Sequence, residues 1–271
     1  MSVPRPVQQI VRTDCSGQLP EGDVGIATAY PRDSGITQDQ DVVFADDFES
    51  YSEIGDLSAN WDEVGQAEFL DLSGQTKAEV GGRRSLEMRI PVREQSLGNA
   101  IAKTFDQKHD VLFVRYYTRF DTEFDLGLKF SHTSCAVYGS ADGQLTPGVA
   151  ADGRNKLYAG LMTYRDARED DSVPPPGELC INLYSPEQRY EWGDKIFPTG
   201  VVYPGSSEKF DFGPDFVSRP NVVPWRANWY CREFMVRANT PGQRDGRVAI
   251  WVDGKLVADF TNLRLRHVAS L

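Results

Sequence analysis

The sequence predicts an all-β protein in which two antiparallel sheets pack into a sandwich or jelly roll. Several segments alternate apolar and polar residues with the period of two that is expected of half-buried strands. No long stretch keeps the 3.6-residue period of an amphipathic helix. The 24 glycines and 16 prolines among 271 residues are enough for a chain with many turns. Together these observations favour two packed sheets over a helical bundle.

The N-terminal part of the chain shows little hydrophobic periodicity. Residues 1–41 lack periodicity and are rich in Pro, Gly, Asp and Gln, so we expect an extended arm packed over a single domain of residues 42–271. A first strand is expected in residues 42–50 (VVFADDFES), where it runs into a polar turn. Residues 85–92 (SLEMRIPV) place Leu86, Met88 and Ile90 on one face of a second strand, and residues 100–105 form a further short strand.

The later strands alternate more clearly. Residues 111–120 (VLFVRYYTRF) carry an apolar face and an aromatic, cationic face that suits either a binding surface or a solvated outer face. Residues 179–184 (LCINLY) point Leu179, Ile181 and Leu183 inward, and residues 230–239 repeat the alternation. Residues 247–252 and 255–260 flank Asp253-Gly254, a strong signal for a two-residue hairpin turn.

Composition and motifs exclude several functions. The net charge of −11 argues against a general nucleic-acid binder and against a polybasic membrane-surface protein. No apolar run suggests membrane insertion, and no signal peptide is visible at the N-terminus. The four widely spaced cysteines form neither a zinc ribbon nor a thioredoxin-like motif, and both free thiols and disulfides stay open. The chain has no phosphate-binding loop, no G-x-S-x-G elbow, no H-E-x-x-H zinc motif and no single-strand carboxylate pair of the sandwich glucanases.

The outward strand faces supply the residue types that β-elimination on a uronic acid needs. A lyase neutralises the uronate carboxylate with Arg, Lys, Asn or Gln, removes the neighbouring proton with a base, and protonates the leaving oxygen with an acid. The alternative is that these side chains make cross-strand pairs with Glu87 or Glu233. The candidate residues are Arg115, Tyr117, Lys129, His132, Arg165, Asn182 and Tyr184.

Three segments together resemble a known family. They are FADDFES (44–50), VRYYTRFDTEFDLGLKFSHT (114–133) and REFMVRANTPGQRDGRVAIWVDGKLVADFTNLRLR (232–266). Over roughly residues 42–271 the chain is similar to the concanavalin A-like β-jelly-roll polysaccharide lyases, especially the alginate and glucuronan lyases of families fourteen and twenty. The resemblance implies a two-sheet jelly roll and an acidic polysaccharide, or another glycan, as the substrate.

The resemblance also implies site residues, with departures from the family pattern. Lys129 stands where the family has its catalytic lysine, although the Pro-Gly that follows there is missing, and Thr163-Tyr164-Arg165 stands for S-x-R. Tyr184 keeps the second tyrosine of Y-x-Y-x-P, whereas Asn182 replaces the first. The implied roles are Tyr184 as general acid and base, His132 or Lys129 as base or electrostatic partner, Arg165, Arg115 and Asn182 as carboxylate contacts, and Tyr117, Thr163, Tyr190 and Trp192 as further substrate contacts.

The family resemblance further implies a structural calcium ion, with Asp47, Glu49 and Asp259 as its expected ligands. No cofactor is expected for the chemistry itself, and a glycan-degrading role implies a secreted protein. Two other functions stay open. A non-catalytic carbohydrate-binding protein would use aromatic platforms such as Tyr190, Trp192 and Trp225. A structural or assembly protein would use the long loops at 166–178 and 198–224 as interfaces.

Overall fold

The computed structural model describes residues 25–92, 98–127, 135–143, 146–165, 173–203 and 210–271. Its contacts divide the chain into two compact units, one of residues 1–29 with 108–271 and one of residues 30–107. The predicted arm lies largely outside the described residues; from residue 25 onward it contains short 3-10 turns. Within the described chain, no helix has both the length and the apolar character that a membrane span requires.

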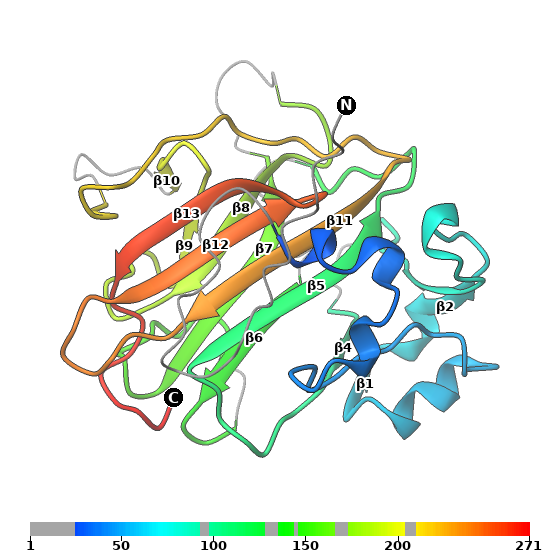
Figure 1. The fold of residues 1–271 in the computed structure, drawn as a ribbon, viewed down its shortest axis with the longest axis horizontal. Coiled ribbons are helices and arrows are strands. Elements are labelled where there is room, and N and C mark those ends of the chain that lie inside the picture. Colours follow the sequence, from blue (N-terminus) through cyan, green and yellow to red (C-terminus); the bar gives the residue numbers. More distant parts are fainter. Residues whose placement is uncertain (1–24, 93–97, 128–134, 144–145, 166–172, 204–209) are drawn as a thin grey trace, which may run out of the picture. The chain divides into compact units, whose positions relative to one another are not determined.

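The larger unit is a sandwich of two antiparallel sheets. The four-stranded sheet has the order β13-β12-β11-β5 and the five-stranded sheet has the order β10-β9-β8-β7-β6, and Figure 1 shows them as two layers with the four-stranded sheet in front. The predicted two-sheet architecture is therefore confirmed. The elements of this unit are η1 (Ile26–Thr28), β5 (Val111–Arg119), β6 (Cys135–Ser140), β7 (Lys156–Tyr164), β8 (Glu178–Tyr184), β9 (Asp194–Ile196), β10 (Val202–Tyr203), β11 (Trp229–Arg237), β12 (Gly246–Val252) and β13 (Lys255–Leu263).

Alternation along the strands places the hydrophobic core between the two sheets. Leu179, Ile181 and Leu183 of β8 are buried there, as predicted, and Val114 and Tyr116 of β5 pack against the same core. The hairpin between β12 and β13 is also confirmed, because Asp253 and Gly254 both adopt positive φ (49° and 80°) as a type I′ turn requires.

The cysteines that the structure describes are free. Cys135, Cys180 and Cys231 form no disulfide, and burial raises the pKa of the Cys180 thiol to about 12. Thiols that hold their protons this firmly are poor nucleophiles and poor metal ligands. Cys15 lies outside the described residues.

The smaller unit contains short strands and 3-10 turns around Tyr51, Leu57 and Leu70. Two pairs of antiparallel strands, β1 with β4 and β2 with β3, make its sheets. Its elements are η2 (Pro31–Asp33), η3 (Ile36–Gln38), η4 (Ile54–Ala59), β1 (Glu63–Gly65), η5 (Ala67–Phe69), β2 (Leu70–Ser73), η6 (Ala78–Val80), β3 (Ser85–Met88) and β4 (Ala100–Ala102).

Two sequence predictions for the smaller unit are corrected. The first strand at 42–50 is wrong, because the Asp46 and Asp47 carboxylates accept hydrogen bonds from the N–H groups of Phe48 and Glu49 and turn the chain there. The strand predicted at 85–92 ends at Met88, three residues before Pro91. Met88 is exposed rather than buried, so only the first part of the predicted apolar face packs inward.

Candidate active site

The outward face of the five-stranded sheet gathers tyrosines and lysines. Leu157, Ala159 and Leu161 of β7 point into the core, so the residues that alternate with them point to the opposite side. The strand register extends this set across the sheet. We call it the tyrosine–lysine face; its aromatic, charged and amide members are Tyr138, Lys156, Tyr158, Tyr164, Glu178, Asn182, Tyr184, Lys195 and Tyr203, and Met162 and Cys180 lie between them on the same side.

Tyr184 lies at one end of a row of three tyrosines from adjacent strands, with Tyr158 in the middle. Its ring meets that of Tyr158 edge to face, with centroids 5.4 Å apart, and Tyr158 lies 6.3 Å from Tyr138. The Lys156 Nζ lies 4.5 Å from the centroid of the Tyr184 ring and donates a hydrogen bond to the carbonyl oxygen of Thr146. The phenol ring is therefore held by an aromatic contact with Tyr158 and by a cation–π contact with Lys156.

The hydroxyl of Tyr184 is a proton donor at neutral pH. Burial, reinforced by the neighbouring Tyr158, raises its pKa to about 12, although the backbone N–H of Gly148 acts in the opposite direction. A phenol with this pKa stays protonated in solution. It can give a proton to an oxygen atom that develops negative charge beside it.

Asn182 is almost completely buried beside Tyr184, with 2% of its surface exposed. Its Oδ1 atom accepts no hydrogen bond from any described residue. The oxygen packs against Gly193, where a Cβ atom would approach it to 2.7 Å. A buried amide oxygen without a protein partner costs free energy unless a ligand or a water molecule donates the missing hydrogen bond.

Lys195 stands directly across from Asn182 in the pairing of β8 with β9. It is 6% exposed, and its Nζ lies 5.0 Å from the centroid of the Tyr164 ring. Burial lowers the pKa of this ammonium group. Neither Lys195, Lys156 nor Tyr158 was among the residues expected from the sequence.

Aromatic side chains stand at the rim of this cluster. Tyr190 and Trp192 follow β8 and are 39% and 41% exposed. The indole ring of Trp192 packs on Gly148, where a Cβ atom would lie only 3.0 Å from the ring. Exposed aromatic faces beside buried polar groups are a common way to hold a sugar ring. The structure therefore brings together four of the expected residues: Asn182, Tyr184, Tyr190 and Trp192.

Other expected residues lie elsewhere. Arg115 and Tyr117 are on the outward face of the four-stranded sheet, because Val114 and Tyr116, which alternate with them along β5, face the core. That face is on the other side of the sandwich from Tyr184, so these two cannot contact the same sugar as Tyr184.

Thr163 and Arg165 also depart from the expected roles. Thr163 shares the inward side of β7 with Leu161 and is buried, so it does not reach the tyrosine–lysine face. Arg165 donates from Nη1 to Asp125 at 2.7 Å and from Nε to the carbonyl oxygen of Val173 at 3.0 Å. These bonds tie the end of β7 to Asp125 and Val173, which lie outside the strands, so the guanidinium is already occupied. The expected bases Lys129 and His132 lie outside the described residues.

The expected calcium ligands have protein partners. Asp259 receives hydrogen bonds from Nε and Nη2 of Arg247, both at 2.8 Å. Glu49 accepts from the N–H groups of Arg83 and Arg84, and these bonds hold the pKa of its carboxyl below the usual range. Among the described residues, no group of three or more His, Cys, Asp and Glu side chains is arranged to hold a metal ion. The calcium site stays a prediction.

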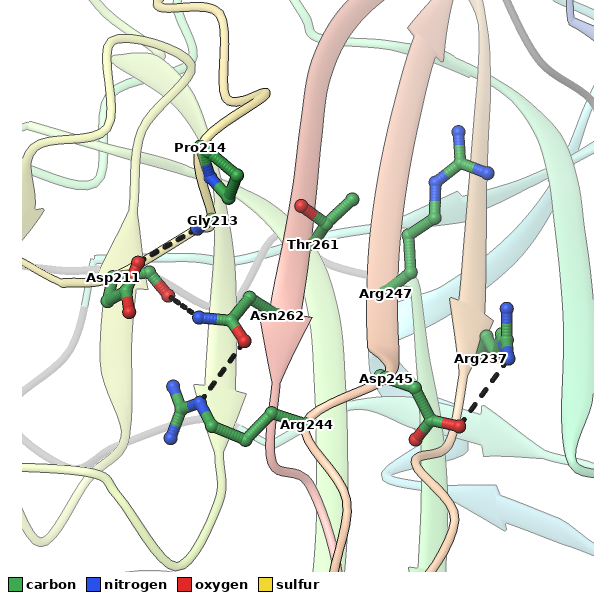
Figure 2. A pocket seen from close by; sticks show the side chains of 10 residues that line it. Asp211, Gly213, Pro214, Arg237, Arg244, Asp245, Arg247, Thr261 and Asn262 are labelled. Atoms are coloured by element: carbon green, nitrogen blue, oxygen red, sulfur yellow. Dashed lines mark hydrogen bonds and ion pairs between the residues drawn. The ribbon is translucent and has the colours of Figure 1, made fainter.

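A hollow of about 560 Å³ lies at the end of the four-stranded sheet, between the 211–214 loop and the ends of β11, β12 and β13 (Figure 2). Three arginines lie at or beside it, and each of them has a carboxylate partner. This hollow consequently offers no excess of positive charge to an acidic ligand, and the tyrosine–lysine face is the better candidate. The ion pairs are Arg237 with Asp245, Arg244 with Glu187, and Arg247 with Asp259.

Comparison with known proteins identifies the fold. No family model matches the chain, and no curated protein matches it. The crystal structure of the marine PL-14 alginate lyase from Aplysia kurodai matches with a TM-score of 0.52 at 14% identity, over 81% of each chain. The jelly roll predicted from the sequence is thereby confirmed. Two further matches are alginate lyase Aly36B (TM-score 0.47, 15% identity, 81% of this chain and 78% of that chain) and alginate lyase vAL-1 from Chlorella virus (TM-score 0.40, 12% identity, 80% and 81%).

Proposed function

We propose that this protein is a polysaccharide lyase that cleaves a uronic-acid polymer by β-elimination on the tyrosine–lysine face. The observation that supports it best is the pair Asn182 and Tyr184. A buried amide whose Oδ1 atom has no described partner stands beside a buried phenol that keeps its proton, on the outward face of a jelly-roll sheet. The fold is shared with an alginate lyase, so alginate is the first polymer to test.

In this mechanism the residues have separate tasks. The Asn182 Nδ2 atom donates a hydrogen bond to the uronate carboxylate and stabilises the charge that develops when the C5 proton leaves, while its Oδ1 atom accepts from a sugar hydroxyl. A base takes that proton, the C4=C5 double bond forms, and the C4–O bond breaks. Tyr184 gives its proton to the departing glycosidic oxygen. Lys129 or His132 is the proposed base.

The test is a screen for the ultraviolet absorbance of the new double bond. Purified protein is incubated with alginate, glucuronan, pectate, heparan and chondroitin, with and without calcium. We expect product from one of these polymers, and we expect Tyr184→Phe to lower kcat by roughly 100-fold or more because general acid catalysis contributes that much. Tyr230→Phe is the matched control, since Tyr230 lies on β11 of the four-stranded sheet, where its hydroxyl accepts a hydrogen bond from the backbone N–H of Trp225. Full activity in Tyr184→Phe would remove the assignment.

A carbohydrate-binding protein without catalysis is the second candidate, because Tyr190 and Trp192 are exposed beside the buried pair. It predicts glycan binding with no unsaturated product from any polymer. For either candidate we propose that the protein works outside the cell, where such polymers are found.

A further inference from the structure

The strongest unexplained group on the tyrosine–lysine face is the ammonium of Lys195. The side chain is 6% exposed, its Nζ lies 5.0 Å from the centroid of the Tyr164 ring, and the Asp194 carboxylate attracts it without forming a direct ion pair. Its described neighbour of opposite charge, Asp194, alternates to the other side of β9 and lies 3.6 Å from the Nε of Arg189. Removing an ammonium from water without a directly paired counterion costs free energy. A buried ammonium of this kind is therefore a candidate for a role in ligand binding or catalysis.

The position of Lys195 places its ammonium close to the Asn182 amide. Lys195 and Asn182 are paired across neighbouring strands, which lie about 4.8 Å apart, and both side chains leave the same side of the sheet. The ammonium and the amide can therefore converge on one anionic group. Of the Asn182 amide only Nδ2 can donate to an anion; its Oδ1 atom, which has no described protein partner, can accept from a sugar hydroxyl instead.

The other cations of this region are already engaged. Arg165 is bound to Asp125, and Lys156 donates to the Thr146 carbonyl. The two arginines expected from the sequence to contact a carboxylate are thus unsuited to it, Arg165 by its ion pair and Arg115 by its place on the opposite face.

We propose that Lys195 is the residue that recognises the substrate carboxylate, with Asn182 as its partner. This inference rests on the proposed lyase function and assigns the charge selectivity of its site. The ammonium forms an ion pair with the carboxylate of the uronate. It stabilises the negative charge that develops there as the C5 proton leaves. The ligand class is consequently a polymer of uronic acid rather than a neutral glycan.

Binding measurements test the inference without turnover. In a Tyr184→Phe background, calorimetry compares tetrasaccharides of alginate and of glucuronan with the same oligosaccharides after their carboxyl groups have been reduced to alcohols. We expect the background protein to prefer an acidic tetrasaccharide. Lys195→Met, which keeps the packing volume, is expected to weaken acidic binding roughly 10- to 100-fold, the effect of one lost charge-assisted hydrogen bond, and to leave neutral binding unchanged.

Two further variants separate charge from packing. Lys195→Arg keeps the positive charge and is expected to restore most of the preference for the acidic ligand. Lys255→Met removes the same charge from an exposed position at the start of β13 and is expected to leave the preference intact. Circular dichroism and a cooperative urea transition confirm that each variant folds. An unchanged acidic preference in Lys195→Met, or no binding of either acidic tetrasaccharide by the background protein, overturns the inference.

The results also distinguish this inference from the proposed function. If Lys195 determines acidic binding but no polymer gives unsaturated product, the inference stands and the lyase proposal fails. If product forms and Lys195→Met keeps the kcat and KM of the original protein, the lyase proposal stands and the inference fails.

Discussion

Gly193 controls the shape of the candidate site, and replacing it by alanine tests the geometry directly. The residue has φ of +78°, and an added Cβ would lie 2.7 Å from Asn182 Oδ1 and 2.7 Å from Tyr184 Cδ2. Left-handed backbone costs a non-glycine residue about 1–2 kcal/mol. Forcing extra atoms into packed surroundings costs about 1–3 kcal/mol more. We therefore expect Gly193→Ala to lose about 2–5 kcal/mol of unfolding free energy.

A matched variant separates the two contributions. Gly242 has a similar φ of +86°, and a Cβ there would meet nothing within 4 Å. Gly242→Ala should therefore lose only the backbone part, about 1–2 kcal/mol. Urea denaturation measures both variants, and the lyase assay should show a fall in kcat for Gly193→Ala alone, because only that change displaces Asn182 and Tyr184. Equal destabilisation of the two variants would refute the packing described around Gly193.

Two more predictions concern charge. Burial alone would raise the pKa of Asp125, but hydrogen bonds from the Gly127 N–H and from Arg165 outweigh it and hold that pKa below its ordinary value of 3.8. The resulting stabilisation is present above pH 3.8 and is lost as the pH falls through the lowered pKa. Arg165→Met should lower the free energy of unfolding by up to about 1 kcal/mol at neutral pH. The urea midpoints of the original protein and of Arg165→Met should converge in acid. The second prediction follows from the net charge of −11, which repels a polyanion. Added salt up to about 0.15 M screens that repulsion more than it screens a buried contact, so the association rate for acidic oligosaccharides should rise or stay level in stopped-flow measurements; a steep fall would place binding on exposed cations instead.

The sequence predicts the sandwich well where apolar residues alternate with polar ones along a strand. β5, β8, β11 and the β12–β13 hairpin follow the expected alternation, since their inward residues reach the core. The prediction fails for residues 42–50, where two aspartates bond to the backbone N–H groups that a strand would have used. Local side-chain competition of this kind leaves the apolar pattern unchanged and is invisible to periodicity.

β7 shows why half of the candidate site escapes the sequence. Nearly all residues of Lys156–Tyr164 are buried, and Gly160 and Met162 share the outward side with the lysine and the tyrosines, so the apolar and polar residues of this strand do not separate into an inner and an outer set. Lys156 and Tyr158 consequently stand out only once the register with β8 is known. Lys195 is missed for a related reason: β9 has three residues, too few to show a period.

The two outward faces of the sandwich explain the remaining errors. Both Arg115 on β5 and Asn182 on β8 alternate with core residues, and sequence alone gives them equal standing. In the structure Gly25 donates its N–H to the Gly254 carbonyl at 3.0 Å and lies so close to Glu233 and Trp251 that a Cβ at Gly25 would come within 2.4 Å of the Glu233 Oε2 atom. Gly25 is thus packed onto the face that carries Arg115, next to Glu233, the residue opposite Arg115 in the strand register. On the tyrosine–lysine face the Asn182 Oδ1 atom is buried without a described partner, and Trp192 stays exposed beside it. The Trp251 Nε1 atom on the Arg115 face is buried without a described partner as well, so unmet hydrogen bonding alone does not separate the two faces. The tyrosine–lysine face differs because it carries two lysines and a protonated phenol beside exposed aromatic rings, the groups that the proposed chemistry needs.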